Sequence, residues 1–389
     1  MIRWNAKSYC NNMLKLAWKF IKFDRSKSIG VVTAIVISIF LIGQQLSLLF
    51  FLMGLMGNLV DNSNVADSDI WVIENQTLNV NSLNNINQRY VQQLRSIEGV
   101  EQTFPILIVP AAVSFLDGKT ASVSLVGSEA PTFITGPNDD RIFEGQISNL
   151  AIPEAVSAEF FNASSWKTDL YLNKPVELNG KSARIKLITK NAQAFGGNHM
   201  YTTIENARFY GNTDPNEVSI IIVRLRQGVE KNVVINQINS LYPTLRAWDV
   251  TKLRSSTVKE ILISSNMGMS FGTLVVFAMI SGFFIIGLTL YSSALDRIKD
   301  YGTLKAIGAK KNYVNRLIIA QAFLYAIFGF IIAMLLLIGF KQGVQNSGLD
   351  INLSFPFTLF LFGLTLLISI GGSLFALRKV SRLEPASVF

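Results

Sequence analysis

Residues 28–60 read SIGVVTAIVISIFLIGQQLSLLFFLMGLMGNLV, a run of 33 residues without Asp, Glu, Lys or Arg. About 20 apolar residues are enough for a helix to cross the hydrocarbon core of a bilayer. Soluble helices of this length carry a polar face, which makes a buried soluble helix the weaker interpretation. The run is too long for a cleaved signal sequence, and no small-residue cleavage site follows it. It predicts a transmembrane helix.

Three further uncharged runs occupy residues 261–295, 317–340 and 351–377. Together with the first run, they predict an α-helical membrane protein with four transmembrane helices, at 29–60, 261–295, 317–340 and 356–377. The first two runs hold 33 and 35 residues and could reach about 50 Å, well beyond a core of about 30 Å. We expect both helices to continue out of the membrane as a stalk, although a loop poor in charge at 261–266 is the alternative.

The composition supports a membrane protein. Of the 389 residues, half are hydrophobic and 16% are charged, whereas soluble domains carry about a quarter charged residues. The single cysteine, Cys10, excludes an internal disulfide, and the single histidine, His199, excludes a histidine-rich metal centre.

The basic residues gather in three short segments that should lie on one side of the membrane. Segments 1–28, 296–316 and 378–389 together carry sixteen Lys and Arg, which makes that side cytoplasmic by the positive-inside rule. The short loop 341–355 and the long segment 61–260 then lie outside. Segment 61–260 has a net charge of −3, so the basic total charge does not indicate a nucleic-acid partner.

Segment 61–260 reads as an extracytoplasmic α/β domain between the first and second transmembrane helices. Strand, helix and strand follow one another at both of its ends, and residues 131–214 are interpreted as an insertion between them. Asp117-Gly118 between two apolar runs predicts a hairpin. Asparagine is frequent at 58–88, which we interpret as compositional bias.

The sequence shows no catalytic, cofactor or metal site. Gly118-Lys119-Thr120 and Gly180-Lys181-Ser182 lack the earlier glycine of a phosphate-binding loop. Gly268 and Gly272 fit the G-x-S-x-G pattern of hydrolases, but they fall in a membrane helix, where this spacing is typical of close helix packing. His199 beside Gly196-Gly197 indicates a surface loop.

Two basic segments have apolar residues at helical spacing. Residues 1–28 predict an amphipathic helix along the cytoplasmic membrane surface. In segment 296–316, the apolar Leu304, Ile307 and Val314 lie between charges, which favours a short helix that binds a protein partner. A solvated basic loop is the alternative.

Two motifs resemble a known family. Residues 300–309 (DYGTLKAIGA) resemble the E-x-G-x-L-[RK]-A-[IL]-G-A signature of the FtsX/MacB/LolC-type ABC transporter permeases, with Asp300 where Glu is usual. Residues 378–386 (RKVSRLEPA) resemble the ending R-x-x-[RK]-[LI]-[DE]-P-A of the same family. Length, the Ile70-Trp71-Val72 run and the small outer domain look most like the DevC subgroup.

The resemblance implies the permease subunit of an ABC-type exporter in the bacterial inner membrane, with both termini cytoplasmic. It implies a homodimer on two separate ATPase subunits that bind the ATP, and often a periplasmic adaptor with an outer-membrane channel. This chain would hold no cofactor and would not itself be an enzyme. The residues in contact with the ATPase would be Thr303, Leu304, Lys305, Ala306, Ile307, Gly308, Ala309 and Lys310.

Two other classes of function fit the same sequence. Division-type relatives activate a periplasmic hydrolase instead of moving a substrate. A four-helix sensor or a membrane-bound enzyme that works without an ATPase is the second alternative.

The predicted topology can be tested by cysteine labelling in a Cys10→Ser background. Asn198→Cys should react with a membrane-impermeant maleimide in intact spheroplasts, because it lies in segment 61–260. Lys310→Cys should react only after the membrane is permeabilised. The reverse pattern would contradict the assignment of sides.

Overall fold

The structure is a computed structural model that describes residues 6–66, 69–195, 198–296, 299 and 311–380. The chain divides into two units. The helical unit comprises Met1–Leu49, Met269–Val344 and Ile351–Phe389, and the head unit comprises Phe50–Gly268 and Gln345–Asp350. The helix α2 (Arg25–Asp61) contributes residues to both units.

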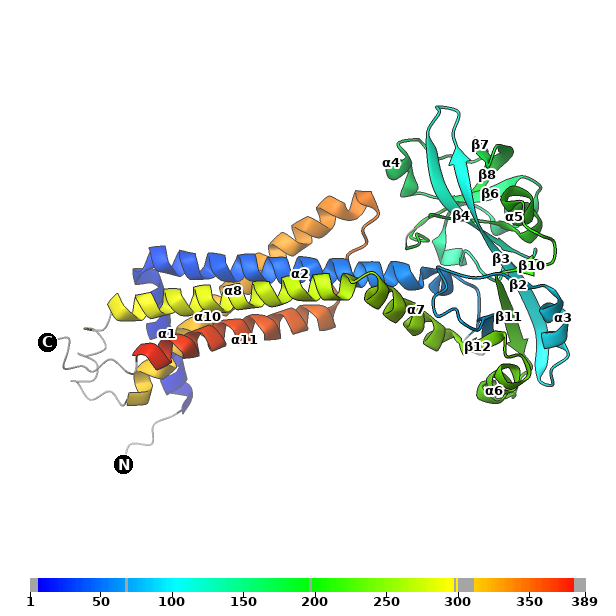
Figure 1. Ribbon diagram of the computed structural model, residues 1–389. Coiled ribbons are helices and arrows are strands. Elements are labelled where there is room, and N and C mark those ends of the chain that lie inside the picture. Colours follow the sequence, from blue (N-terminus) through cyan, green and yellow to red (C-terminus); the bar gives the residue numbers. More distant parts are fainter. Residues whose placement is uncertain (1–5, 67–68, 196–197, 297–298, 300–310, 381–389) are drawn as a thin grey trace. The chain divides into compact units, whose positions relative to one another are not determined.

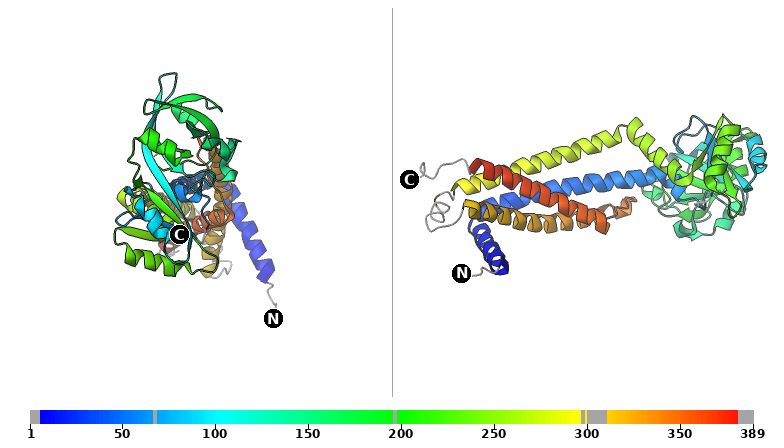
Figure 2. Two further views of the ribbon diagram at one scale, coloured as in Figure 1. Left: turned by 90° about the vertical axis from the view of Figure 1, so that its right-hand side faces the viewer. Right: turned by 90° about the horizontal axis from the view of Figure 1, so that it is seen from below.

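The helical unit confirms the predicted class of fold. Among the described residues, four helices are long and apolar enough to cross a membrane, and they are α2, α8 (Met267–Asp296), α10 (Lys311–Val344) and α11 (Phe355–Val380). These helices lie alongside one another in Figures 1 and 2. A domain rich in strands stands between the first and the second of them in the sequence.

Small residues let these helices approach closely. A Cβ atom placed on Gly43 would lie 2.6 Å from Leu337 Cδ1, and one on Gly282 would lie 2.6 Å from Ser38 Oγ. The hydroxyl of Ser369 on α11 donates to the Ala322 carbonyl on α10 at 2.8 Å. Packing of this kind is typical of membrane helices, whose association gains little from the hydrophobic effect.

The basic helix α1 (Ala6–Phe23) packs against protein on its apolar side. Ala17 is fully buried in a cluster with Leu317 and Ile318 of α10. The rings of Trp18 and Phe328 are 5.3 Å apart. Part of the apolar side of α1 therefore packs on α10, and its position along the membrane surface stays a prediction.

The core of the head unit is a split β-α-β arrangement. Its strands are β1 (Ile70–Glu74), β3 (Val100–Ser114), β11 (Ile220–Leu225) and β12 (Leu245–Asp249), in the antiparallel order β12-β1-β11-β3. The helix α3 (Arg89–Arg95) connects β1 with β3, and α6 (Lys231–Leu241) connects β11 with β12. The predicted strand–helix–strand pattern at both ends is confirmed.

The remaining strands of the head extend this sheet to ten strands in the part of the chain that the structure describes. The hairpin of β3 and β4 (Thr120–Ser128) turns at Asp117-Gly118 as predicted. Residues 131–214 add the strands β5 (Ile142–Gly145), β6 (Ala155–Glu159), β7 (Pro175–Leu178), β8 (Lys181–Thr189) and β9 (Asn198–Thr203) and the helices α4 (Asn162–Trp166) and α5 (Ile204–Gly211). A separate two-stranded sheet pairs β2 (Ile86–Asn87) with β10 (Glu217–Val218).

The central strands of the head are buried on both faces. Along β1, Ile70 and Val72 belong to a core shared with α3, α5 and α6, whereas Trp71 and Ile73 belong to a core on the opposite face. That second core also contains Leu59 at the end of α2. Burial on both faces explains why these strands read as continuous apolar runs without alternation.

The second predicted stalk helix is interrupted, which corrects the prediction of one continuous helix over 261–295. The helix α7 (Val250–Ser264) begins at the N-cap Asp249, whose carboxylate accepts hydrogen bonds from the backbone N–H groups of Thr251 and Lys252. It ends where Asn266 adopts a left-handed conformation with φ +55°. Asparagine tolerates this conformation better than most residues, so an uncharged run could contain a helix end.

Two glycines of α10 offer a matched test of the bundle packing. A Cβ atom on Gly329 would lie 2.8 Å from Ile35 Cβ on α2, whereas no atom lies within 4 Å of one on Gly339. Ile35 is β-branched and cannot move aside easily. Gly329→Ala should therefore lower the free energy of unfolding by about 1–3 kcal/mol.

Gly339→Ala should leave the thermal unfolding temperature in detergent unchanged or slightly raised. Circular dichroism would follow the helical signal of both variants. Equal unfolding temperatures for the two variants would contradict the packing of α10 on α2.

Candidate functional site

An ion pair joins the two helices of the stalk, which we define as residues 50–61 of α2 together with α7. Arg254 Nε lies 2.7 Å and 2.8 Å from the two carboxylate oxygens of Asp61. This hydrogen bond raises the pKa of Arg254. Both side chains are about one-third exposed, so the pair contributes less than about 1 kcal/mol to stability. Its main effect is to fix the positions of the two helices.

Gly57 makes this ion pair possible. A Cβ atom on Gly57 would lie 2.9 Å from Arg254 Nε and 3.0 Å from Arg254 Cγ. The arginine therefore lies directly across the backbone of α2. One turn earlier, no atom lies within 4 Å of a Cβ placed on Gly54.

A loop after β1 is hydrogen-bonded to both stalk helices. The side-chain amide of Asn81 donates to the Met56 carbonyl of α2 at 2.8 Å. The backbone N–H of Val80 donates to Thr257 Oγ1 of α7 at 3.1 Å. The loop therefore holds α2 and α7 at one place on the head.

Segment 191–195 makes a second attachment to α2. The side-chain amide of Asn58 donates to the Gln193 carbonyl, and the backbone N–H of Phe195 donates to the Leu55 carbonyl at 3.2 Å. Segment 191–195 also lies close to the connection between α10 and α11. Gly348 of that connection has φ +78°, and a Cβ atom there would clash with the Gln193 side chain.

A buried carboxylate fixes segment 191–195. Glu159 is 1% exposed and accepts hydrogen bonds from Thr189 Oγ1 at 2.8 Å, Asn191 N at 2.9 Å and Ala192 N at 3.0 Å. Burial raises the pKa of Glu159, although these hydrogen bonds favour the charged form. The Glu159 carboxyl group therefore fixes the backbone at the start of segment 191–195, which contacts α2.

The structure describes only some of the predicted site residues. Thr303, Leu304, Lys305, Ala306, Ile307, Gly308, Ala309 and Lys310 lie outside the described residues. Gly268 has its nearest neighbours at 3.7 Å, and no atom lies within 4 Å of a Cβ on Gly272. Within this chain, Gly43, Gly282, Gly329 and Gly372 pack closely against neighbouring helices instead. Packing at Gly268 and Gly272 therefore stays a prediction that would require another chain.

The interpretation of His199 as a surface-loop residue is wrong. His199 lies on β9, is 6% exposed and packs edge-to-face on Tyr201 with a centroid distance of 6.4 Å. Burial lowers the pKa of His199 to about 4, so the imidazole is neutral at physiological pH. Parallel pairing of β9 with β4 buries the residue, and this long-range contact has no local sequence signal.

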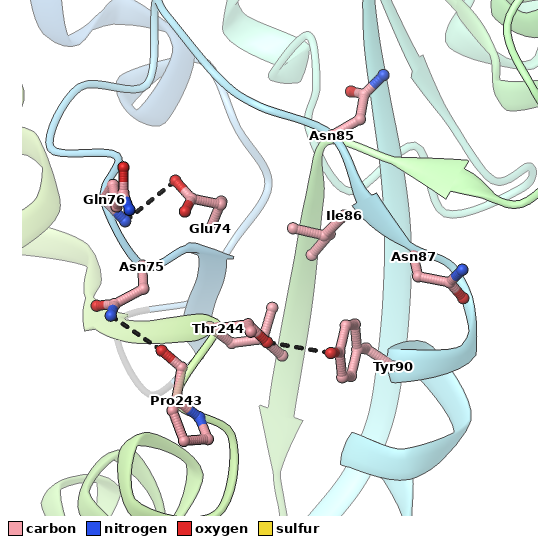
Figure 3. A pocket seen from close by; sticks show the side chains of 10 residues that line it. Glu74, Asn75, Gln76, Asn85, Ile86, Asn87, Tyr90, Pro243 and Thr244 are labelled. Carbon is pink, nitrogen blue, oxygen red and sulfur yellow. Dashed lines mark hydrogen bonds between the residues drawn. The ribbon is translucent and has the colours of Figure 1, made fainter.

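The head also has an open hollow of about 470 Å³ (Figure 3), formed where β1 ends and β12 begins. Its polar side chains largely satisfy one another. The hydroxyls of Tyr90 and Thr244 are 3.0 Å apart, and the Asn75 amide donates to the Pro243 carbonyl at 2.9 Å. Among the described residues, no group of His, Cys, Asp and Glu is arranged to hold a metal ion. The hydrogen bonds among the polar side chains of the hollow give no indication of a catalytic role.

The fold is that of a membrane protein with four long apolar helices and a strand-rich head that stands between the first and the second of them in the sequence. Residues 272–385 match the family described as FtsX-like permease C-terminal. This part of the chain is therefore similar to the C-terminal domain of FtsX-like permeases. The comparison with curated proteins finds no match.

Three solved structures are each similar to about half of this chain. The periplasmic region of MacB from Actinobacillus actinomycetemcomitans has 10% identity and a TM-score of 0.38, covering 51% of this chain and 94% of that one. The extracellular domain of the ABC-type transporter YknZ from Gram-positive bacteria has 13% identity and a TM-score of 0.35, covering 46% and 99%. A domain of a permease protein from Porphyromonas gingivalis has 17% identity and a TM-score of 0.32, covering 46% of this chain and 88% of that one.

Sequence reasoning missed the residues of the junction. Asn58 and Asn81 belong to the asparagine-rich stretch that we interpreted as compositional bias, yet both side chains donate hydrogen bonds to backbone carbonyls. The frequency of asparagine beside the end of a long helix was the available signal. Asp61, the first charge after the uncharged run, was a second signal.

His199 predicts how the stability of the head depends on pH. Its pKa is about 4 in the folded protein and about 6.5 when exposed, so between these values the unfolded state binds the additional proton. Stability contributed by this residue is present above pH 6.5 and is lost as the pH falls toward 4. The total loss should be about 3 kcal/mol.

Urea unfolding at pH 7 and pH 5, followed by the tryptophan fluorescence of the head, would measure about 2 kcal/mol of this loss, because the rest occurs below pH 5. His199→Gln cannot take up a proton in this range and should show a smaller difference between the two pH values. Glu159 is present in both proteins, so its own pH dependence cancels. An identical difference for both proteins would contradict the burial of His199.

Proposed function

We propose that this chain is the permease subunit of an ABC-type exporter, which transmits the conformational change of a separate ATPase to its head. One observation carries the proposal: α2 is a single helix of 37 residues whose last turn belongs to the core of the head. The FtsX-like permease domain at 272–385 supports the class of transporter. The DevC subgroup remains part of the proposal.

An unbroken helix is suited to transmitting displacement. Sharp kinks in helices occur mainly at a proline, at a bulge or where backbone hydrogen bonds are lost, and α2 is one continuous helix that contains no proline. At its far end, Leu59 and Val60 are buried with Trp71 and Phe104 of the head sheet. Displacement of α2 along its axis would therefore move the head and not only the end of the helix.

The second helix of the stalk has a joint in the same proposal. The left-handed Asn266 separates α7 from α8, so α7 can follow the head while α8 changes its tilt. The ion pair of Asp61 and Arg254 keeps α7 aligned with α2 at the head.

The partners and location belong to the proposal as well. The permease would form a homodimer in the bacterial inner membrane, with its termini in the cytoplasm and its head outside. Residues 303–310 would contact the ATPase, which holds the ATP. A periplasmic adaptor and an outer-membrane channel would complete the export path.

Gly54 offers a direct test of transmission through α2. A side chain at this position meets no atom within 4 Å, so substitution changes the helix without removing a contact. Gly54→Pro removes a backbone hydrogen bond and introduces a clash, at a cost of about 3 kcal/mol, and should create a flexible joint. Gly54→Ala is the matched control, because alanine favours the helix.

The readout is the distance between spin labels on the heads of a dimer assembled with its ATPase. The label sits at Ser240→Cys, an exposed position on α6, in a Cys10→Ser background. ATP should change this distance in the parent protein and in Gly54→Ala. In Gly54→Pro most of the change should be lost while ATP hydrolysis continues. An undiminished change in Gly54→Pro would refute transmission through α2.

A further inference from the structure

A second cavity, of about 240 Å³, lies in the head beside the stalk. Its floor is a row of side chains across three strands. Pro110 on β3 pairs in register with Ser124 on β4, and Ser124 pairs with His199 on β9. Residues directly opposite in a sheet point to the same face, so these three side chains form one continuous surface.

Two segments attached to α2 form the walls. Asn81 and Leu83 come from the loop after β1, and Phe195 comes from segment 191–195. Asn81 donates to the Met56 carbonyl and Phe195 N–H to the Leu55 carbonyl, which are consecutive residues of the stalk. The cavity is therefore built where the head rests on the stalk.

The floor contains a buried polar group that needs a partner. Nδ1 of His199 has no hydrogen-bond partner within the described part of the chain. An unsatisfied buried polar atom costs about 1–3 kcal/mol, and each such atom in a native protein calls for an explanation. A molecule in the cavity could supply hydrogen-bonding groups to this imidazole and to the neighbouring Ser124 hydroxyl.

The lining selects against charge. None of the described residues that line the cavity is Asp, Glu, Lys or Arg, and His199 is neutral at physiological pH. A charged ligand would lose its hydration without gaining an ion pair. The cavity volume of about 240 Å³ is large enough for a small ring system, because an apolar cavity of about 150 Å³ already holds benzene.

We propose that this cavity binds a small neutral amphiphile, with an apolar ring or short chain against Ile108, Leu83 and Phe195 and one hydroxyl or carbonyl group at Ser124 and His199. This inference does not depend on the proposed exporter function. Because both walls are hydrogen-bonded to α2, a ligand that fits the cavity also favours the arrangement in which the loop and segment 191–195 rest on the stalk.

The single histidine of the chain makes the site directly observable. The full-length protein would be labelled with ¹³C at histidine Cε1, purified without a histidine tag and placed in lipid nanodiscs, so that one imidazole signal reports on His199. The probe is benzyl alcohol, which is neutral and has a ring and a hydroxyl. It should shift the signal saturably, with half-saturation at about 1 mM or below.

Two variants of β4 separate binding in the cavity from partition into lipid. Ser124→Leu fills the floor and should raise the half-saturation concentration at least tenfold. Ser122→Leu makes the same change two residues earlier, at an exposed position outside the cavity lining, and should bind as the parent does. Lipid partition alone would give a linear shift shared by all three proteins.

Two further probes test the chemistry. Benzoate should not shift the signal, because its charge finds no partner, and toluene should bind several-fold more weakly, because it lacks the hydroxyl. The proposal is overturned if benzyl alcohol gives no saturable shift, or if the Ser124→Leu protein, with an unfolding temperature equal to that of the parent, gives the same isotherm. Equal binding of toluene would remove the role of His199 and Ser124.

Discussion

The burial of the stalk ends in the sheet of the head is the interaction on which the rest of the structure depends. Leu59 and Val60 of α2 and Leu253 of α7 share one core with Trp71 and Phe104. The central strands are apolar on both faces, because one face packs against α3, α5 and α6 and the other packs against the stalk ends together with head residues such as Phe133 and Leu150.

Polar contacts fix the rotation of α2 on the head, in addition to the apolar contacts that attach it. Hydrophobic burial is roughly proportional to area and does not fix the rotation of a helix. Asn58 donates to the Gln193 carbonyl, Asn81 donates to the Met56 carbonyl of α2, and Arg254 donates to the Asp61 carboxylate of α2. Hydrogen bonds have strict geometry. Apolar contacts thus hold the helix on the head, and these side chains determine which side of it faces each loop.

The sequence predicts those parts of the fold that follow from local pattern. Uncharged runs identify the long helices, Asp117-Gly118 identifies a hairpin, and apolar runs such as 220–225 identify strands buried on both faces. The burial of His199 depends on the pairing of β9 with β4, about 75 residues away in the sequence, and no local pattern encodes such a pairing. The helix end at Asn266 could not be predicted from the sequence either. A single polar residue ends a helix through its backbone conformation and hardly changes the hydropathy of the surrounding run.

The two stalk helices differ in a way that follows from these local facts. The helix α2 passes without a break from one unit of the chain to the other, whereas α7 ends at Asn266 before α8 begins. Two unbroken helices fixed to one head would resist any change in the angle between them, because both ends would be clamped. One continuous helix and one jointed helix remove that restraint while keeping a direct connection. The loop that carries Asn81 contacts both helices on the head side of this joint, so the cavity at His199 lies on the part of the molecule that would move with α2.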